Sequence, residues 1–184
     1  MKFYFDGCSW TYGGGLEEHS HSLDCRWSKL VSNHFGAEEF NIAEGGASLS
    51  TVIRHLFTGK YRQIEFDVKD FDVFFIQIPN LAWEEYYSEP AHAWRRHKPD
   101  WGYSEKHQRL KEKISKYTIR SFVSDLGKPL FLSYLPPKIY AMDYDLYFSK
   151  GYKYARLPEG HPNPTGHRQI ADDVIKKLEN EILL

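Results

Sequence analysis

The strongest constraint on the fold is a nearly continuous apolar run over residues 72–78, Asp-Val-Phe-Phe-Ile-Gln-Ile. A strand with so few polar residues must be covered on both faces, which is typical of the centre of a parallel sheet. Shorter runs over residues 2–5, 39–42 and 130–134 predict three further strands. Helical patterns alternate with these runs, and this alternation predicts an α/β domain with a central parallel sheet.

Four segments have the apolar spacing of helices that pack on a sheet. They span residues 26–35, 48–57, 104–125 and 165–184. The third helix has Tyr103, Leu110, Ile114 and Tyr117 in register. Thr165 or Asn163 could cap the start of the last helix, because both side chains can accept a hydrogen bond from a free backbone N–H.

The chain has 184 residues, which fits a single domain over residues 1–184. Apolar residues make up 41% of the chain, enough for a core, and the formal net charge is −1. Binding to nucleic acid or to an anionic membrane needs a basic excess, so we expect neither partner. Asp6 interrupts the first apolar run too early for a signal peptide, and no run is long enough to span a membrane. These features predict a cytoplasmic protein. The chain has two cysteines, which are too few for a disulfide framework.

A candidate nucleophile follows the first predicted strand, within residues 7–13, Gly-Cys-Ser-Trp-Thr-Tyr-Gly. A sharp turn there would leave the Ser9 hydroxyl at the mouth of the sheet, where it could react if a histidine reaches it. His161 is the candidate histidine, near the other end of the chain. Cys8 is a rival nucleophile, because thiolates are reactive. Neighbouring side chains at a strand end point in opposite directions, however, so only one of the two can face His161.

Four blocks of the sequence, taken in order, resemble those of the SGNH or GDSL hydrolase family. The blocks are residues 7–13, residues 41–48 (Asn-Ile-Ala-Glu-Gly-Gly-Ala-Ser), residues 77–80 (Gln-Ile-Pro-Asn) and residues 159–167. They correspond to the family's Gly-Asp-Ser turn, its Gly, its Asn and its Asp-x-x-His. The resemblance implies a flavodoxin-like three-layer sandwich, the SGNH hydrolase fold, and hydrolysis of an ester through an acyl-enzyme intermediate. We expect no metal and no other cofactor.

The resemblance also implies roles for individual residues. Ser9 would attack the acyl carbonyl, and His161 would take its proton and return it to the leaving group. The negative oxygen that forms needs fixed hydrogen-bond donors. The family pattern assigns these donors to the backbone N–H groups of Ser9 and Gly46 and to the side-chain amide of Asn80. A glycine such as Gly46 allows the backbone to approach a substrate closely.

The sequence departs from the family pattern in two places. Cys8 replaces the Asp of Gly-Asp-Ser, which is not the catalytic acid. The family's acid lies three residues before the histidine, where this chain has Pro158, and Glu159 lies two before. Glu159 is therefore the candidate acid of a triad with Ser9 and His161. The alternatives are a serine–histidine dyad, or an acid from elsewhere such as Asp143 or Asp145.

An insertion over residues 84–100, rich in aromatic and charged residues, follows the central strand. Open parallel sheets bind ligands at this place, so the insertion could be a substrate-binding lid, or else a decorated surface loop. Sugars stack on Tyr and Trp rings, so a small ester on an acylated glycan, such as an acetyl ester, is the expected substrate. The opening residues also look like small SGNH proteins of tailed bacteriophages, which would place the protein in a host cytoplasm.

Other classes of function are weighed against the esterase. A non-catalytic binding module could retain the SGNH fold, since the family pattern is altered at Cys8 and Glu159. A phosphate-binding protein would need a phosphate loop, for which residues 13–15, Gly-Gly-Gly, are the candidate, but no Walker lysine follows them. Metal-ligand types occur at His19, His21, Asp24 and Cys25. Their spacing matches no closed zinc pattern, and a solvated loop is the expectation.

Overall fold

The computed structural model describes residues 1–78, 84–88, 93–97, 105–134, 146–147 and 154–182. Within these ranges, five strands form one sheet in the order β2-β1-β5-β8-β9, and every neighbouring pair is parallel. The strands are β1 (Lys2–Asp6), β2 (Glu38–Asn41), β5 (Val73–Ile78), β8 (Leu130–Tyr134) and β9 (Leu146–Tyr147). The apolar run forms the central strand β5, which is buried along its whole length. The predicted central parallel sheet is confirmed.

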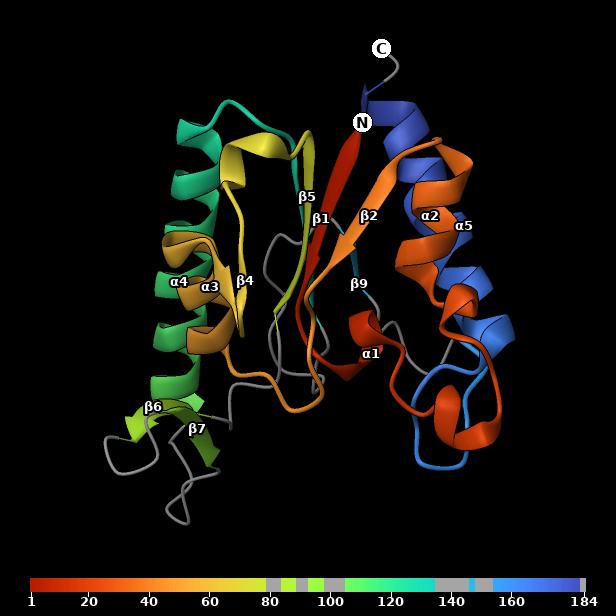
Figure 1. The fold of residues 1–184 in the computed structure, drawn as a ribbon, viewed down its shortest axis with the longest axis horizontal. Helices are drawn as coiled ribbons and strands as arrows, with labels where there is room; N and C mark the ends of the chain where they lie inside the picture. Colours follow the sequence, from red (N-terminus) through yellow and green to blue (C-terminus); the bar gives the residue numbers. More distant parts are fainter. Residues whose placement is uncertain (79–83, 89–92, 98–104, 135–145, 148–153, 183–184) are drawn as a thin grey trace.

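Helices cover both faces of this sheet, which gives the three layers of an α/β sandwich (Figure 1). On one face, α2 (Trp27–His34) packs beside α5 (Pro164–Ile182), and on the other lie α3 (Leu49–Thr58) and α4 (Glu105–Asp125). The bounds of these helices differ from the predicted ones by at most two residues. None of the described helices combines the length and the apolar character needed to cross a bilayer.

Alternate residues of each strand point into two separate cores. Phe5 and Phe75 face α2 and α5, whereas Tyr4 and Phe74 face α3 and α4. The Phe75 ring stacks on Phe5 of β1 at a centroid distance of 4.7 Å and on Phe131 of β8 at 5.4 Å. One layer of aromatic rings therefore connects the three central strands and holds β1, which leads into the Ser9 turn, in register with β5.

The helix α4 has the predicted position but an unexpected orientation. Leu110, Ile114 and Tyr117 share one face, as their spacing predicts, but that face is exposed to solvent at 56%, 56% and 64%. The described buried residues of this helix are Glu112, Ser115, Ile119 and Val123. Because a helix is a rigid rod, Ile119 and Val123, which pack into the core beside β8, determine which side of the whole helix faces the sheet.

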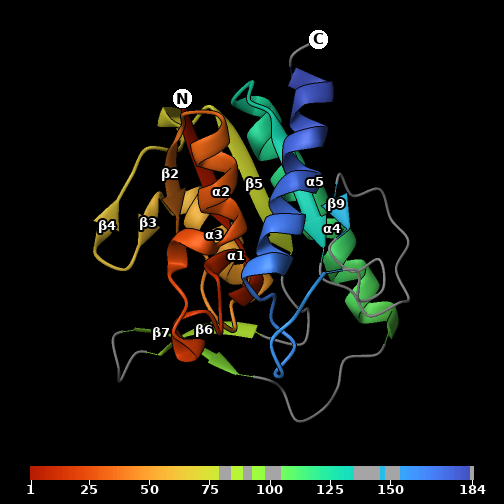
Figure 2. The same ribbon diagram turned by 90° about the vertical axis from the view of Figure 1, so that its right-hand side faces the viewer.

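Several short elements escaped prediction. They are β9 at the edge of the main sheet, α1 (Ser9–Tyr12), the 3₁₀ helices η1 (Glu17–His19), η2 (Leu23–Cys25) and η3 (Val68–Asp70), and the paired strands β3 (Lys60–Tyr61) with β4 (Ile64–Glu65) and β6 (Glu84–Ser88) with β7 (Ala93–His97). The described part of the insertion over residues 84–100 is thus an antiparallel hairpin. Figures 1 and 2 show this hairpin at the end of the molecule where α1 lies.

The start of α5 resolves the choice between the two capping residues. The helix begins at Pro164, whose ring favours the first position of a helix because no N–H is needed there. The side-chain oxygen of Asn163 accepts a hydrogen bond from the backbone N–H of Gly166 at 2.9 Å. Asn163, and not Thr165, is therefore the capping residue, and the cap fixes where the chain leaves the preceding turn and enters the helix.

The aromatic layer should dominate the stability of the sheet. We expect Phe75→Ala to lower the free energy of unfolding by about 3–5 kcal/mol, because it removes a buried ring and leaves a cavity between the sheet and the helices α2 and α5. Ile114→Ala on the exposed face of α4 is the control, with an expected change within about 0.5 kcal/mol. Urea unfolding followed by circular dichroism measures both, and similar losses in the two variants would contradict this account of the core.

Candidate active site

Ser9 lies just beyond the carboxyl end of β1, where the chain turns over the sheet. Gly7 has a φ of 146°, and a Cβ added to it would lie 2.6 Å from the Cβ of Gln77 on β5. Only a glycine lets the backbone adopt this conformation so close to the neighbouring strand. Ser9 is the first residue of α1, so its backbone N–H has no carbonyl partner within that helix.

The side chain of Gln77 also holds the residues around Ser9. Its Oε1 accepts hydrogen bonds from Thr11 Oγ1 at 2.7 Å and from Cys8 Sγ at 3.3 Å, in a buried environment. Cys8 is a free thiol, and burial raises its pKa to about 11. A buried, protonated thiol is a poor nucleophile, so the structure does not support Cys8 as the rival of Ser9.

A buried hydrogen-bond network lies on the other side of the same turn, and sequence reasoning missed it. The Asp6 carboxylate accepts the backbone N–H of Gly7 at 2.7 Å and the Tyr4 hydroxyl at 3.0 Å. Its Oδ2 is also 3.0 Å from Nδ1 of His55 on α3, and both side chains are almost fully buried. The available sequence signal was a carboxylate ending an apolar strand and a histidine on the apolar face of the helix over residues 48–57.

His161 meets Ser9 from the far end of the chain. Its Nε2 is 2.9 Å from the Ser9 hydroxyl oxygen, a hydrogen bond between residues 152 positions apart. The His161 side chain is 28% exposed, so the pair is open to solvent on one side. With the ring proton on Nδ1, Nε2 would accept the Ser9 hydroxyl proton, which is the arrangement that a nucleophilic serine needs.

Backbone hydrogen bonds close the turn that holds His161. Leu157 donates its N–H to the carbonyl of His161 at 2.8 Å, and Gly160 donates to the carbonyl of Leu157 at 2.9 Å. Asn163 donates to the carbonyl of Ala155 at 3.0 Å, just before α5 begins. The position of the imidazole is therefore set by the backbone of a closed turn rather than by a flexible tail.

Glu159 lies close to His161 but does not form the expected hydrogen bond. Its Oε1 is 3.6 Å from Nδ1 of His161, longer than the roughly 2.6–3.2 Å of a hydrogen bond between catalytic groups. Its Oε2 is only 3.1 Å from Nε2 of His19. The backbone N–H of Glu159 and the neighbouring imidazole of His19 lower the pKa of its carboxyl, which favours the ionised form.

The glycines at positions 14 and 15 provide space beside this group of residues. A Cβ at Gly14 would lie 2.9 Å from the Ser9 Cβ and 3.4 Å from Cδ2 of His161. A Cβ at Gly15, where φ is 84°, would collide with the Glu159 carboxylate. The Gly-Gly-Gly sequence, weighed earlier as a phosphate loop, is thus where the segment after Ser9 packs against the turn that bears His161.

The second sequence block is tied to the Ser9 segment by Asn41. Its side-chain N–H₂ donates to the Thr11 carbonyl at 2.9 Å, and its side-chain oxygen accepts from the Ala43 N–H at 3.0 Å. Gly46 follows in the loop between β2 and α3, where its φ is 68° and a Cβ would meet open space. Asn80, the third predicted oxyanion donor, lies outside the described residues, as do the alternative acids Asp143 and Asp145.

No family model and no curated protein sequence matches this chain. Its structure is similar to an acetyl xylan esterase, Est2A from Butyrivibrio proteoclasticus, with a TM-score of 0.64 and 14% identity; the match covers 98% of this chain and 64% of that one. TesA matches with a TM-score of 0.61 and 13% identity over 100% of both chains. A lipolytic G-D-S-L family protein from Desulfitobacterium hafniense matches with a TM-score of 0.58 and 13% identity, over 96% of this chain and 99% of that one.

These matches extend over 96% or more of this chain. The chain has the SGNH/GDSL hydrolase fold. On this fold the first three sequence blocks begin at the carboxyl ends of β1, β2 and β5, and the fourth runs into the start of α5. The strands are parallel, so the first three blocks start from the same edge of the sheet. At that edge Ser9 is hydrogen-bonded to His161. The Glu159 carboxylate lies 3.1 Å from the His19 imidazole and 3.6 Å from the His161 imidazole.

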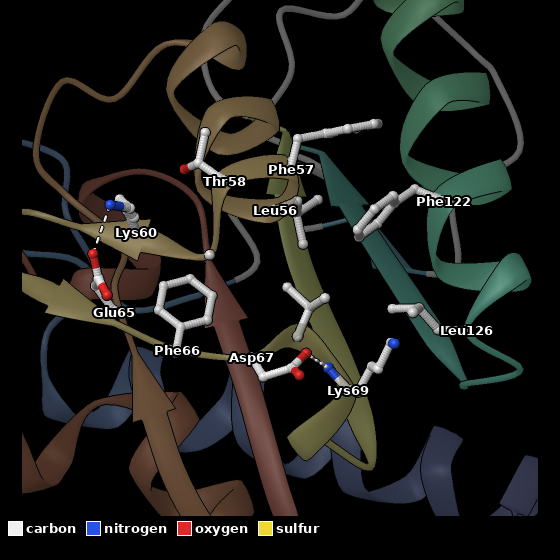
Figure 3. Close-up of a pocket in the computed structure, with 12 residues that line it drawn as sticks. Leu56, Phe57, Thr58, Lys60, Glu65, Phe66, Asp67, Lys69, Phe122 and Leu126 are labelled. Carbon is white, nitrogen blue, oxygen red and sulfur yellow. Dashed lines mark hydrogen bonds and ion pairs between the residues drawn. The ribbon is translucent and has the colours of Figure 1, made fainter.

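A pocket of about 670 Å³ has a lining that does not include Ser9 or His161, and Figure 3 shows its lining residues. It is lined by the end of α3, by the β3–β4 pair, by η3 and by α4. The rings of Phe57 and Phe122, both in the lining, lie tilted to each other at a centroid distance of 4.5 Å. The segment η3 leads into the amino end of β5, whereas Ser9 follows the carboxyl end of β1. The cavity therefore lies at the opposite edge of the sheet from the SGNH site.

His167, the last residue of the fourth sequence block, is fully buried at the start of α5. Its Nδ1 accepts the backbone N–H of Trp27 at 3.3 Å, which ties α5 to α2. Burial lowers the pKa of its imidazole to about 4, and the nearby positive charges of His161 and Arg26 act in the same direction. His167 is therefore a neutral structural residue at physiological pH.

This buried histidine should make the fold sensitive to acid. An unfolded histidine takes up a proton near pH 6.5, whereas His167 does so only near pH 4, so protonation favours the unfolded state between these values. We expect the unfolding free energy to fall from about pH 6.5 to pH 4, and to fall less in His167→Asn, which keeps an acceptor for Trp27. Urea unfolding at several pH values tests this, with exposed His21→Asn as control. An identical pH dependence in His167→Asn and the wild type would refute the assignment.

Proposed function

We propose that the protein hydrolyses a carboxylic ester through an acyl-Ser9 intermediate. The observation that supports this most directly is the 2.9 Å hydrogen bond between Ser9 Oγ and His161 Nε2. It occurs at the carboxyl edge of a parallel sheet, the usual place for a ligand site in open α/β folds. The fold neighbours, an acetyl xylan esterase among them, are consistent with this chemistry.

In the proposed reaction, Ser9 Oγ attacks the acyl carbon while Nε2 of His161 takes the hydroxyl proton. His161 then protonates the departing alcohol oxygen as the acyl–oxygen bond breaks. A water molecule, deprotonated by the same imidazole, attacks the acyl-Ser9 carbonyl. His161 then returns the proton to Ser9 Oγ as the acyl–Oγ bond breaks and the acid is released. The Glu159 carboxylate, 3.6 Å from Nδ1, would favour the imidazolium electrostatically in both steps.

The developing negative oxygen would be stabilised by three donors. The Ser9 N–H is available for this role because it begins α1. The Gly46 N–H and the Asn80 amide are proposed on the resemblance of their blocks to the family pattern. The open space where a Gly46 side chain would stand supports a close approach of substrate to that loop.

We favour an acylated glycan as the substrate, with a small acyl group such as acetyl. The hairpin of β6 and β7 lies at the same end of the molecule as α1 (Figure 2). Its sequence supplies tyrosine, tryptophan and arginine, the residue types that stack on sugar rings or bind their hydroxyls. The acetyl xylan esterase among the fold neighbours supports the same class, although this chain spans only 64% of its length.

The nucleophile can be tested with variants that preserve the fold. Ser9→Ala and His161→Ala should each abolish most hydrolysis of p-nitrophenyl acetate. Since the two residues act as one unit, the double variant should be little slower than either single variant. Labelling by a fluorophosphonate should require Ser9. A folded Ser9→Ala protein with full activity would refute the mechanism, and a wild-type protein that is neither labelled nor active would favour the non-catalytic binding module.

The role of Asn80 is a separate prediction. We expect Asn80→Ala to lower kcat by about 10²–10³, with a smaller change in KM, because the lost donor acts mainly in the transition state. Asn80→Asp is a second variant of similar shape that replaces the donor amide with a carboxylate. Steady-state kinetics on p-nitrophenyl acetate would measure both. A kcat within about threefold of wild type in both variants would remove Asn80 from the oxyanion hole, because that change is well below the loss expected for a donor.

A further inference from the structure

The carboxylate of Glu159 lies beside His161 but is too far from it to form a hydrogen bond. Only one residue separates Glu159 from His161, and Gly160 between them has a φ of 95°. This close spacing leaves Oε1 at 3.6 Å from Nδ1 of His161. The ring nitrogen is buried and forms no hydrogen bond among the described residues. Contact with His161 alone therefore does not fix the direction of the carboxylate.

The shorter contact of this carboxylate is with His19. Nε2 of His19 lies 3.1 Å from Oε2, although the two residues are 140 positions apart. We propose that His19 is a positioning residue that holds the Glu159 carboxylate beside His161, and so maintains the charge that His161 needs as the base. This inference rests on the proposed serine mechanism. It assigns to His19 the orientation of the carboxylate, which the short Glu-x-His spacing alone does not fix.

The path of the chain supports this role. The segment after Ser9 passes through the three glycines and reaches His19 at the end of η1. It can pass close to the Glu159 carboxylate only because Gly15 has no side chain there, since a Cβ at this position would also lie 2.8 Å from Leu157 Cδ1. One continuous segment thus holds the nucleophile at its start and the partner of the acid ten residues later.

The solvent exposure of His19 and Glu159 indicates whether their contact should affect stability or catalysis. The His19 and Glu159 side chains are 40% and 34% exposed, so solvent screens their interaction and it should add little to stability. Its effect should instead fall on orientation, which influences kcat more than substrate binding. The chain offers a matched control: His34 Nε2 lies 3.0 Å from Glu179 Oε1 on α2 and α5, with exposures of 45% and 48%.

The test is a mutant cycle on the complete chain. His19→Ala should lower kcat for p-nitrophenyl acetate by about tenfold at nearly constant KM, the scale of one hydrogen bond to a charged group. His19→Gln, whose amide nitrogen can take the place of Nε2, should recover most of this loss. His34→Ala should match the wild type in kcat and KM. Thermal melting should show that His19→Ala and His34→Ala are equally folded.

The double variant decides whether His19 acts through Glu159. His19→Ala combined with Glu159→Gln should be no slower than Glu159→Gln alone, because the second change removes what His19 holds. Three results would overturn the inference. They are a double variant in which the two single losses of kcat multiply, a wild-type kcat in His19→Ala, and a wild-type kcat in Glu159→Gln. The rate at which a fluorophosphonate labels Ser9 allows the same comparison of variants without an ester substrate. If Ser9→Ala is inactive while His19→Ala is normal, only the role of His19 fails; if Ser9→Ala stays active, the serine mechanism fails.

Discussion

The close passage of Gly7 over β5 is the contact on which the geometry of the site depends. Asp6, the last residue of β1, pairs with Ile76 of the parallel strand β5, so the next residue, Gly7, lies directly beside Gln77. Gly7 permits this passage, and the Gln77 side chain then holds the turn through Thr11 and Cys8. The backbone around Ser9 is thus fixed by packing and hydrogen bonds that also bury the neighbouring thiol.

The second half of the site depends on how the end of the chain returns to the sheet. The helix α5 packs on α2, and buried His167 accepts the N–H of Trp27 where the two helices meet. Asn163 caps α5 and also donates to the Ala155 carbonyl, so the turn between them is closed at its base. His161 projects from this turn to Ser9. A polar core residue and a helix cap therefore position a candidate catalytic base.

Two histidine–carboxylate pairs flank the Ser9 turn, in very different environments. Asp6 and His55 are almost fully buried, and Asp6 holds the Gly7 backbone from the side of α3. Glu159 is partly exposed and lies between His161 and His19. Breaking the buried pair would leave a charge without water, so it contributes mainly to structure. Solvent screens the partly exposed pair of Glu159 and His19, so this pair contributes little to stability.

The sequence by itself determined where β1, β2, β5 and β8 and the four longer helices lie along the chain, the central place of β5, and the blocks that contain Ser9 and His161. These features are local, because hydrophobic periodicity and short motifs are set by neighbouring residues. Only the tertiary structure decided that the face of α4 with Ile114 is exposed, that Gly15 makes room for Glu159, and that His19 is the nearer partner of this carboxylate. Such facts depend on segments far apart in the sequence, 140 residues in the case of His19 and Glu159, that meet only when the layers pack. No local pattern encodes that distance or the direction in which a side chain finally points.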